Sequence, residues 1–337
     1  MQGKSCFIDP DGFRTLVHIK KSEYPLNHRD GVMLTGSCFT EHIGKNLADN
    51  KFTVNLNPFG IVYHPAAIGI QLQRLLNGEE YTRGELVFRD GLWHSFDHHG
   101  SFSDPDRQVC LNNLNHHLKE AAAFIRNAGH LILTFGSARA YHLRASDKLV
   151  SNCHKFPDSD FAIRFYEPDE ILDILLPALS ELRRINPRIR FVWSVSPVRY
   201  LKEGTPGNQL SKASLIRAVA GLMNMYPDSY YFPAYEIFMD DLRDYRFYDT
   251  DLIHPGPAGI AYVWKRFCEG CILQESIELM GKIEPITRAA GHRPMGGSAE
   301  SLRNFRAAQL EKISALQKEH PWLDLSRESE LFSREIR

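Results

Sequence analysis

The stretch Gly31-Val-Met-Leu-Thr-Gly-Ser-Cys-Phe-Thr40 constrains the fold of this chain more than any other. Its apolar run ends in Gly36-Ser37, and a pattern typical of a helix begins at Thr40. The stretch therefore predicts a strand, a tight turn and a helix, with the Ser37 hydroxyl at the turn. Open α/β folds bind ligands at this carboxyl edge of the sheet. The amide of Ser37 also lies at a helix N-terminus, where negative charge is favoured.

Four further apolar runs predict strands, and helical patterns separate them. The runs cover residues 52–56, 130–136, 189–196 and 230–235, and Pro233 places the last one at a sheet edge. Helices are expected over residues 40–49, 66–76, 111–127, 168–185, 211–225 and 258–280. This alternation predicts an α/β fold, a three-layer α/β/α sandwich around a mostly parallel five-stranded sheet.

Two β-hairpins interrupt the alternation. Asp90-Gly91 lies between the strand-like runs 86–89 and 92–96, and an Asp-Gly pair there favours a hairpin because both positions need positive φ. A second hairpin is expected from residues 141–144 and 149–152. It would return Asn152, Cys153 and His154 toward the carboxyl end of the strand at 130–136.

The C-terminal segment differs in pattern from the rest. Residues 288–298 are rich in glycine and predict a loop, and residues 298–319 predict an amphipathic helix. We therefore expect an α/β domain over residues 1–280 and a helical extension over residues 281–337 packed on it.

The composition limits the kinds of partner. The 337 residues include 40 Lys and Arg against 41 Asp and Glu, so the formal net charge of -1 indicates neither nucleic acid nor an acidic membrane as a partner. No run approaches the ~18 apolar residues of a membrane span. The first twenty residues hold Asp9, Asp11 and Arg14 and no apolar core, so we expect no secretory signal. The six scattered cysteines are expected to be free thiols of a cytoplasmic protein.

A nucleophilic serine needs a base, and the base needs a partner that fixes its tautomer. His254 is the best candidate base, because Pro255 and Pro257 restrain its loop. Asp251 lies three residues earlier, so its carboxylate can reach Nδ1 of His254 and leave Nε2 for Ser37. Cys38 is a rival nucleophile, but the residue after the turn is expected to point away from the crevice.

The order of these residues, with Ser near the N-terminus and Asp and His together near the C-terminus, resembles the SGNH (GDSL-type) hydrolase superfamily. Over roughly residues 25–270 the chain resembles its GSCFA family in particular, although Thr40 stands where the family name has alanine. The motifs that carry the resemblance are Gly36-Ser-Cys-Phe39, Asn57-Pro-Phe-Gly60, Trp93-His-Ser-Phe-Asp-His-His99, Thr134-Phe-Gly136, Asn152-Cys-His154, Ser196-Pro-Val-Arg199, Gly207-Asn-Gln-Leu-Ser211 and Asp251-Leu-Ile-His-Pro255.

The resemblance implies a flavodoxin-like three-layer fold and a hydrolytic centre in which Ser37 is the nucleophile, His254 the base and Asp251 its orienter. Gly60 falls where the superfamily has a glycine whose amide helps to form the oxyanion hole.

The superfamily's third motif, Gly-X-Asn, departs from this pattern. The chain reads Gly136-Ser-Ala138 there, so the asparagine is missing. Loss of one oxyanion donor can cost on the order of 10²–10³ in rate. We expect Asn152 to substitute for it, with Asn57 as the second choice.

Several side chains near these motifs are expected to line the substrate crevice. The spacing of His94, His98 and His99 around Asp97 also permits a metal site. Because neighbouring side chains of a strand point to opposite faces, we expect no metal, with some of these histidines in the crevice and the rest in structural hydrogen bonds. Arg199 could bind an anionic part of a substrate or face solvent. The expected substrate-binding residues are Tyr63, His64, His98, His99, His154 and Arg199.

These features predict a serine hydrolase that needs no cofactor and acts on a small acyl ester. By analogy with the superfamily, the substrate is an acetyl ester of a carbohydrate-like alcohol. An acyltransferase with the same residues and a non-catalytic binding module are the alternatives, and a metal-dependent hydrolase comes last. The expected partner is a small-molecule or glycan ester, with no nucleic acid and no membrane.

Overall fold

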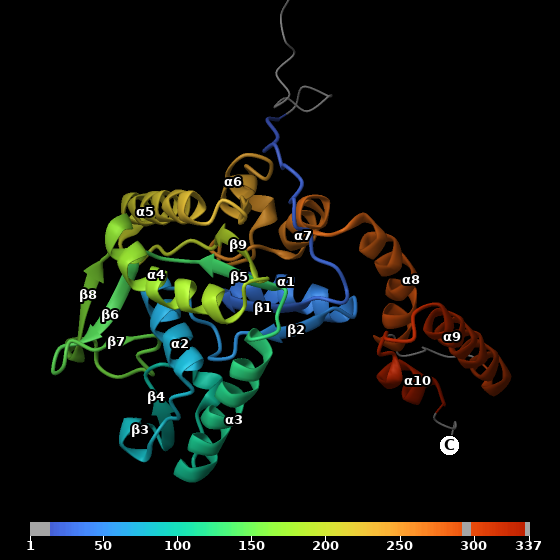
Figure 1. The fold of residues 1–337 in the computed structure, drawn as a ribbon, viewed down its shortest axis with the longest axis horizontal. Helices are drawn as coiled ribbons and strands as arrows, with labels where there is room; N and C mark the ends of the chain where they lie inside the picture. The colour runs from blue at the N-terminus through green and yellow to red at the C-terminus, as the bar shows by residue number, and fades with distance from the viewer. Residues whose placement is uncertain (1–13, 292–297, 334–337) are drawn as a thin grey trace, which may run out of the picture.

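The computed structural model describes residues 14–291 and 298–333. At its centre is a five-stranded sheet with the strand order β10-β9-β5-β1-β2 (Figure 1). Every neighbouring pair of these strands is parallel. The predicted sheet is thus confirmed, including the edge position of its last strand. The strands are β1 (Gly31–Gly36), β2 (Thr53–Leu56), β5 (His130–Phe135), β9 (Arg190–Val195) and β10 (Tyr230–Phe232).

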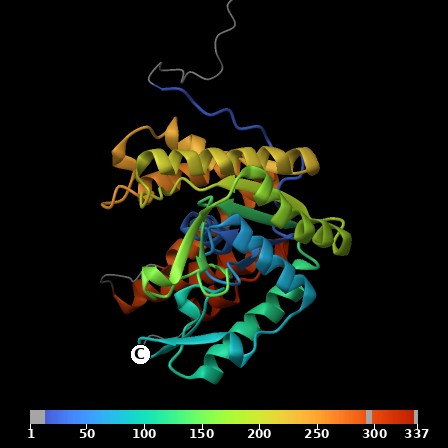
Figure 2. The same cartoon turned by 90° about the vertical axis from the view of Figure 1, so that its left-hand side faces the viewer.

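Helices cover both faces of the sheet, as both views show (Figures 1 and 2). Because side chains alternate along a strand, Met33 of β1 packs into one helical layer, while Val32 and Leu34 pack into the other. The three-layer α/β/α sandwich is therefore confirmed. One layer contains α2 (Pro65–Asn77), α3 (Arg107–Ile125), α4 (Pro168–Ile185) and α5 (Gly204–Met225), and the other contains α1 (Cys38–Asp49), α6 (Ala234–Met239) and α7 (Pro257–Cys271).

Both predicted hairpins are present. Asp90 and Gly91 have φ angles of 50° and 80°, as the turn between β3 (Leu86–Arg89) and β4 (Leu92–Ser95) requires. Strand β6 (Arg139–Leu143) pairs with β7 (Leu149–Val150) and also with β8 (Phe161–Phe165), which the sequence analysis missed. The short 3-10 helices are η1 (Arg83–Glu85), η2 (Gly100–Phe102), η3 (Asp158–Asp160) and η4 (Tyr245–Phe247).

The single helix expected over residues 258–280 is wrong, because the chain breaks into α7 and α8 (Gln274–Gly291). At the break, Leu26 of the N-terminal arm pairs with Ile272, and the Leu273 amide donates to the Leu26 carbonyl over 2.9 Å. The arm thus takes up backbone groups that a continuous helix would use. Helix α8 also runs into the loop expected over residues 288–298, of which residues 292–297 lie outside the described residues.

Helix α8 and the helices α9 (Ala299–Glu319) and α10 (Ser326–Ser333) lie beside the sandwich, beyond α7 (Figure 1). They share a separate apolar cluster that includes Ile283, Ile313 and Phe332. Lys51 of the sandwich binds Glu328 of α10 over 2.7 Å. This packing supports our proposal of a helical extension over residues 281–337. Among the described residues, no helix combines the length and the apolar character needed to cross a lipid bilayer.

Candidate active site

Ser37 lies at the carboxyl end of β1 and is the N-cap residue of α1. Gly36 before it has a φ of 155°, and a Cβ there would lie 2.5 Å from both the Thr134 carbonyl oxygen and Thr40 Oγ1. Only glycine therefore fits between the ends of β1 and β5. Ser37 does not cap its own helix; its hydroxyl donates to Ser196 Oγ over 3.0 Å. The candidate nucleophile is thus directed away from the helix amides that an N-cap serine ordinarily binds.

A cavity of about 420 Å³ is lined by candidate catalytic residues from distant parts of the sequence. Ser37 and His254 both line it, although 217 positions separate them in the sequence. Tyr63, Ser196 and Tyr200 are also among its walls. The cavity lies at the carboxyl ends of β1, β5 and β9, where the sequence predicted the site.

The Asp251-His254 pair has the predicted geometry. Nδ1 of His254 lies 2.6 Å from Oδ2 of Asp251, while Oδ1 of Asp251 accepts the amides of Ile253 and His254 over 2.9 Å each. The bond to His254, followed by these backbone bonds, lowers the pKa of Asp251 to about 2. The Arg199 amide donates to the Ile253 carbonyl over 3.3 Å and ties this loop to the chain after β9. Nε2 of His254 is left to face a substrate or Ser37.

Ser37 donates to Ser196 in this structure, so the hydrogen bond from Ser37 to His254 that the chemistry needs is not formed. A rotation of the Ser37 side chain is required to bring its proton to Nε2 of His254. Such bonds are often long or poorly aligned until a substrate is bound. The roles of Ser37, His254 and Asp251 stay predictions.

The three expected oxyanion donors differ in their surroundings. The Gly60 amide donates to the Asn57 carbonyl over 2.7 Å, so its predicted role requires this turn bond to open. Asn57 accepts the Gly36 amide through Oδ1 over 3.0 Å, and its Nδ2 is buried without a partner. Asn152 accepts the His154 amide within its own loop over 2.9 Å and is not among the cavity walls. Gly60 and Asn57 are not among the cavity walls either, although Asn57 bonds the residue before Ser37. The donor roles of Gly60, Asn152 and Asn57 stay predictions.

Tyr63 and Arg199 line the cavity, whereas the four expected histidines do not. Burial raises the pKa of Tyr63 to about 12, so this phenol keeps its proton. The Arg199 guanidinium lies over the ring of Tyr248 at 4.4 Å and bonds its hydroxyl. The Arg199 side chain is therefore held by Tyr248 and is not free in solvent.

The expectation that His64 lines the crevice is wrong. His64 caps α2, since its Nδ1 accepts the Ala66 amide over 3.1 Å. The residue is 4% exposed, and its ring packs edge-on against Tyr166. Burial lowers the pKa of His64 to about 3, so the ring stays neutral.

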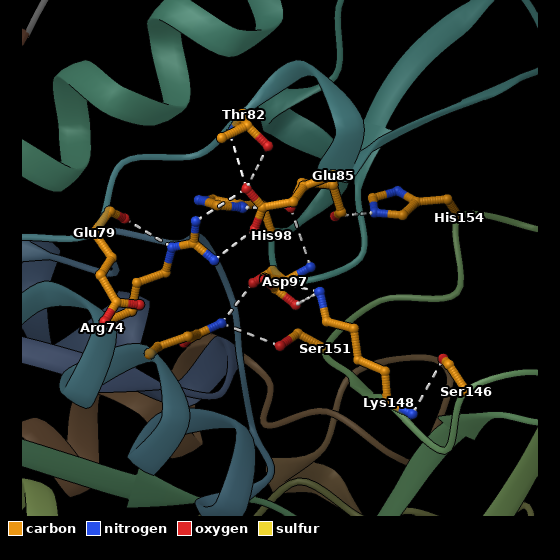
Figure 3. Close-up of polar contacts among 12 residues, drawn as sticks. Arg74, Glu79, Thr82, Glu85, Asp97, His98, Ser146, Lys148, Ser151 and His154 are labelled. Atoms are coloured by element: carbon orange, nitrogen blue, oxygen red, sulfur yellow. Dashed lines mark hydrogen bonds and ion pairs between the residues drawn. The ribbon is translucent and has the colours of Figure 1, made fainter.

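The expectation is also wrong for His98, His99 and His154, which are not among the cavity walls. His98 and His154 lie in the loops that follow β4 and β7 (Figure 3). His98 is buried among aromatic rings and bonds Ser95, and burial lowers its pKa to about 3. His154 donates to the Ser95 carbonyl over 2.8 Å, and burial lowers its pKa to about 4. His99 packs against Gly60 and caps η2.

Asp97 shows why this cluster has a structural role. Its carboxylate pairs with Lys148 (Figure 3). Its carbonyl accepts a hydrogen bond from Gln71, which also donates to Ser151. These bonds join the first hairpin to α2 and to the second hairpin. No group of His, Cys, Asp and Glu in residues 14–291 and 298–333 has an arrangement that could hold a metal ion.

Cys38 lines the cavity, so the expectation that it points away is wrong. Burial, and then the charge of Glu41, raises the pKa of the Cys38 thiol. The thiol therefore keeps its proton and is a weaker nucleophile than its position suggests.

Sequence reasoning missed the part played by Ser196 and by Lys212 of α5. Lys212 is 1% exposed, and its Nζ donates to the carbonyls of Gly136 and Ser196 over 2.7 Å each. Burial lowers its pKa to about 7. The sequence does hold one sign that Lys212 is buried. It lies on the apolar stripe of α5, in helical register with Leu215, Val219 and Leu222.

Comparison with known proteins places the chain in a family. A search among curated proteins returned no match. Two of the similar solved structures share little sequence identity with this chain and have low TM-scores. A carbohydrate esterase family 3 protein from Talaromyces cellulolyticus shares 11% identity, with 75% of this chain and 98% of that chain covered and a TM-score of 0.31. An acetyl xylan esterase (Est2A) from the rumen bacterium Butyrivibrio proteoclasticus shares 11% identity, with 72% and 63% covered and a TM-score of 0.35.

These scores assign neither activity nor substrate to this chain. The family comparison is more extensive, because residues 31–267 match the GSCFA family and residues 283–337 match the GSCFA domain protein, C-terminal domain. The first match alone spans more than half of the chain and includes Ser37, Asp251 and His254. The chain belongs to the GSCFA family.

Proposed function

We propose that this protein is a serine esterase of the SGNH type that hydrolyses a small acyl ester. The observation that carries the proposal is the shared cavity of about 420 Å³, which Ser37 and His254 both line. Asp251 holds the His254 ring at 2.6 Å and leaves Nε2 available as a base. A serine, a base and an orienter are the parts that nucleophilic acyl transfer requires.

In the proposed reaction, Ser37 Oγ attacks the acyl carbonyl while Nε2 of His254 takes its proton. Asp251 stabilises the imidazolium that forms, because its carboxylate is ionised at neutral pH. His254 then gives the proton to the leaving alcohol, and an acyl-enzyme remains on Ser37. Water attacks this acyl group with His254 again as the base, which releases the acid and restores Ser37.

The cavity walls support a carbohydrate-like alcohol as the leaving group. The rings of Tyr63 and Tyr200 lie 6.4 Å apart, and the Tyr200 hydroxyl bonds Tyr141 over 2.7 Å. Lys202 binds the same Tyr141 hydroxyl over 3.1 Å. This wall offers apolar ring faces together with hydroxyl and ammonium groups, which suits a polyhydroxylated ligand. We therefore propose a small acyl group, such as acetyl, on such an alcohol.

The test is hydrolysis of a short activated ester, such as p-nitrophenyl acetate, by purified variants. Ser37→Ala and His254→Ala are each expected to abolish it. Cys38→Ala, at the next position of the same cavity, is the matched control and is expected to keep activity if Ser37 is the nucleophile. Full activity of Ser37→Ala would rule the proposal out.

One observation favours a second candidate, a non-catalytic binding module. Ala138 supplies no oxyanion donor, and the Gly60 amide is engaged with Asn57. A fluorophosphonate probe separates the two candidates, because only an activated serine reacts with it. Failure of the folded protein to label at Ser37 would favour the binding module. An acyltransferase would use the same residues with an alcohol in place of water, and product analysis with added sugar acceptors would reveal it.

A further inference from the structure

The oxyanion hole of the proposed site lacks a side-chain donor at the expected place. Ala138 is fully buried, and its amide donates to Ser211 Oγ over 2.7 Å. An oxyanion that develops beside Ser37 needs preorganised donors within hydrogen-bond distance. The site must therefore supply another group close to Ser37 if it hydrolyses esters.

Ser196 lies where such a donor is needed. It follows β9 directly, its amide donates to the Phe135 carbonyl over 2.8 Å, and it lines the cavity beside Ser37. Its Oγ accepts the Ser37 hydroxyl over 3.0 Å and the Val198 amide over 3.3 Å. Both bonds use the oxygen of Ser196 as an acceptor, so neither of them uses its own proton.

The geometry points to Ser196 as the side-chain oxyanion donor of this site and to Lys212 as the residue that positions it. This inference rests on the proposed esterase function. It gives a chemical role to Ser196, which the sequence analysis noted only as part of a family motif, and to Lys212, which lies outside those motifs.

The proton positions fit this role. In the observed state the Ser37 proton is directed at Ser196. When Ser37 turns toward His254, its proton moves to Nε2 and Ser196 Oγ loses that bond. The carbonyl oxygen that Ser37 attacks is bound to the same carbon as Ser37 Oγ in the tetrahedral intermediate, so it stays close to Ser37, and the inference places it on the side where Ser196 Oγ lies 3.0 Å away in the observed state. The Ser196 hydroxyl donates to this oxyanion, forms no covalent bond and keeps its proton throughout.

Lys212 fixes the backbone that carries Ser196. Its Nζ joins the Gly136 carbonyl after β5 to the Ser196 carbonyl after β9, which holds the two strand ends at one spacing. Neither acceptor is a carboxylate, and the ring of Tyr235 lies 5.7 Å from Nζ. When protonated, this buried amine also places positive charge beneath the cavity floor, where low polarity makes it effective.

The test compares steady-state hydrolysis of p-nitrophenyl acetate by Ser196→Ala and by Ser194→Ala. Ser194 is a matched control, because its buried hydroxyl lies two residues earlier on β9 and donates to the Phe232 carbonyl instead. We expect Ser196→Ala to lower kcat on the order of 10²–10³-fold with little change in KM. Ser194→Ala is expected to keep kcat. Ser196→Thr, which retains a hydroxyl, is expected to recover part of the loss and serves if the alanine variant does not fold.

The positioning role of Lys212 has its own readout. The groups that face its Nζ are the Gly136 and Ser196 carbonyls and the Tyr235 ring. Lys212→Met is expected to lower kcat and to remove the fall in kcat/KM that deprotonation of Lys212 produces as the pH rises through about 7. A loss of folding alone would change the amount of active enzyme and leave the shape of this pH profile intact.

The outcomes separate this inference from the proposed function. If Ser196→Ala keeps the kcat of the unmodified protein while Ser37→Ala is inactive, the inference is wrong and the esterase proposal stands. If the unmodified protein hydrolyses no ester and does not react with a fluorophosphonate, the proposed function is wrong and this inference falls with it. An unchanged pH profile in Lys212→Met would reject the role given to that residue.

Discussion

Asp251 binds His254 in two ways, through Nδ1 of the ring over 2.6 Å and through the backbone amide over 2.9 Å. One carboxylate therefore shapes the loop and orients the base. Both side chains are about half exposed, so the orientation depends on these bonds and not on burial. Because Asp251 and His254 belong to one short loop, the local sequence alone is enough to bring the two side chains together.

We predict that Asp251→Asn lowers kcat for ester hydrolysis by about 10²–10⁴-fold. Asparagine keeps an oxygen for the Ile253 and His254 amides, so the loop should persist, but the negative charge that stabilises the imidazolium is lost. Ester hydrolysis and a near-ultraviolet circular dichroism spectrum would check both statements. Activity equal to that of the unmodified protein would show that His254 does not depend on this carboxylate.

Gly36→Ala is predicted to destabilise the protein by about 2–4 kcal/mol, because a Cβ would meet the Thr134 carbonyl and Thr40 Oγ1 at a positive φ. Gly281→Ala is the control, since a Cβ there meets nothing within 4 Å and alanine favours the helix. Urea unfolding of both variants gives the comparison. Equal stability of the two would contradict the close approach of β1 and β5 at Ser37.

Lys212 predicts a pH dependence of stability. Its pKa is about 7 in the fold against 10.5 for an ordinary lysine, so between these values the unfolded chain binds more protons than the folded one. The free energy of unfolding then rises with pH across this interval, by up to ~1.4 kcal/mol per pH unit, because the cost of burying the charge disappears.

Lys212→Met removes this contribution. Since other groups titrate in the same interval, the difference between the two proteins is the quantity to measure. Urea unfolding at several pH values from 6 to 10 is expected to show that difference change steadily with pH. Parallel curves for the two proteins would mean that the folded state does not lower the pKa of Lys212.

Glu328→Gln is predicted to destabilise the attachment of the C-terminal helices by about 3 kcal/mol, because it leaves the Lys51 ammonium in a site where both side chains are largely buried. Glu319→Gln removes the partner of Lys282 in an exposed pair and is expected to cost at most about 1 kcal/mol. Urea unfolding compares the two. A larger effect of Glu319→Gln would contradict the role of Lys51 and Glu328.

A truncation after Met280 tests the same attachment. It removes Ile283, Ile286 and their partners in α9 and α10, and it exposes apolar surface of Leu279. We therefore expect lower stability and a greater tendency to aggregate. Unchanged stability would show that the packing of residues 281–337 does not stabilise the rest of the protein.

The parts of the site that the sequence predicted are those set by neighbouring residues. Ser37 was found from a strand, a turn and a helix within ten positions, and Asp251 and His254 from a single loop. Local chemistry was enough because the backbone path over such a distance has few alternatives. The sheet was likewise predicted, since its strands are apolar throughout and separated by helices.

The histidines were misplaced because their position depends on how distant segments pack. His98 and His154 lie 56 positions apart, yet both bond to Ser95, in a cluster that joins two insertions. No local pattern tells a histidine of such a cluster from one in a crevice. Lys212 was missed for the same reason, since its two acceptors follow different strands.

The pairing of the N-terminal arm with the end of α7 has a consequence for synthesis of the chain. Leu26 bonds to Cys271 and Leu273, and the Ser22 amide donates to the Gly270 carbonyl. The ribosome adds roughly 5–20 residues per second, so this early segment waits on the order of ten seconds or more for its partner. Until then β1 can already pair with β2 and β5, and Tyr24 of the arm can bond His130 of β5, while Ser22 and Leu26 still lack the backbone partners that α7 supplies. Formation of this contact therefore joins two segments that the ribosome makes far apart in time.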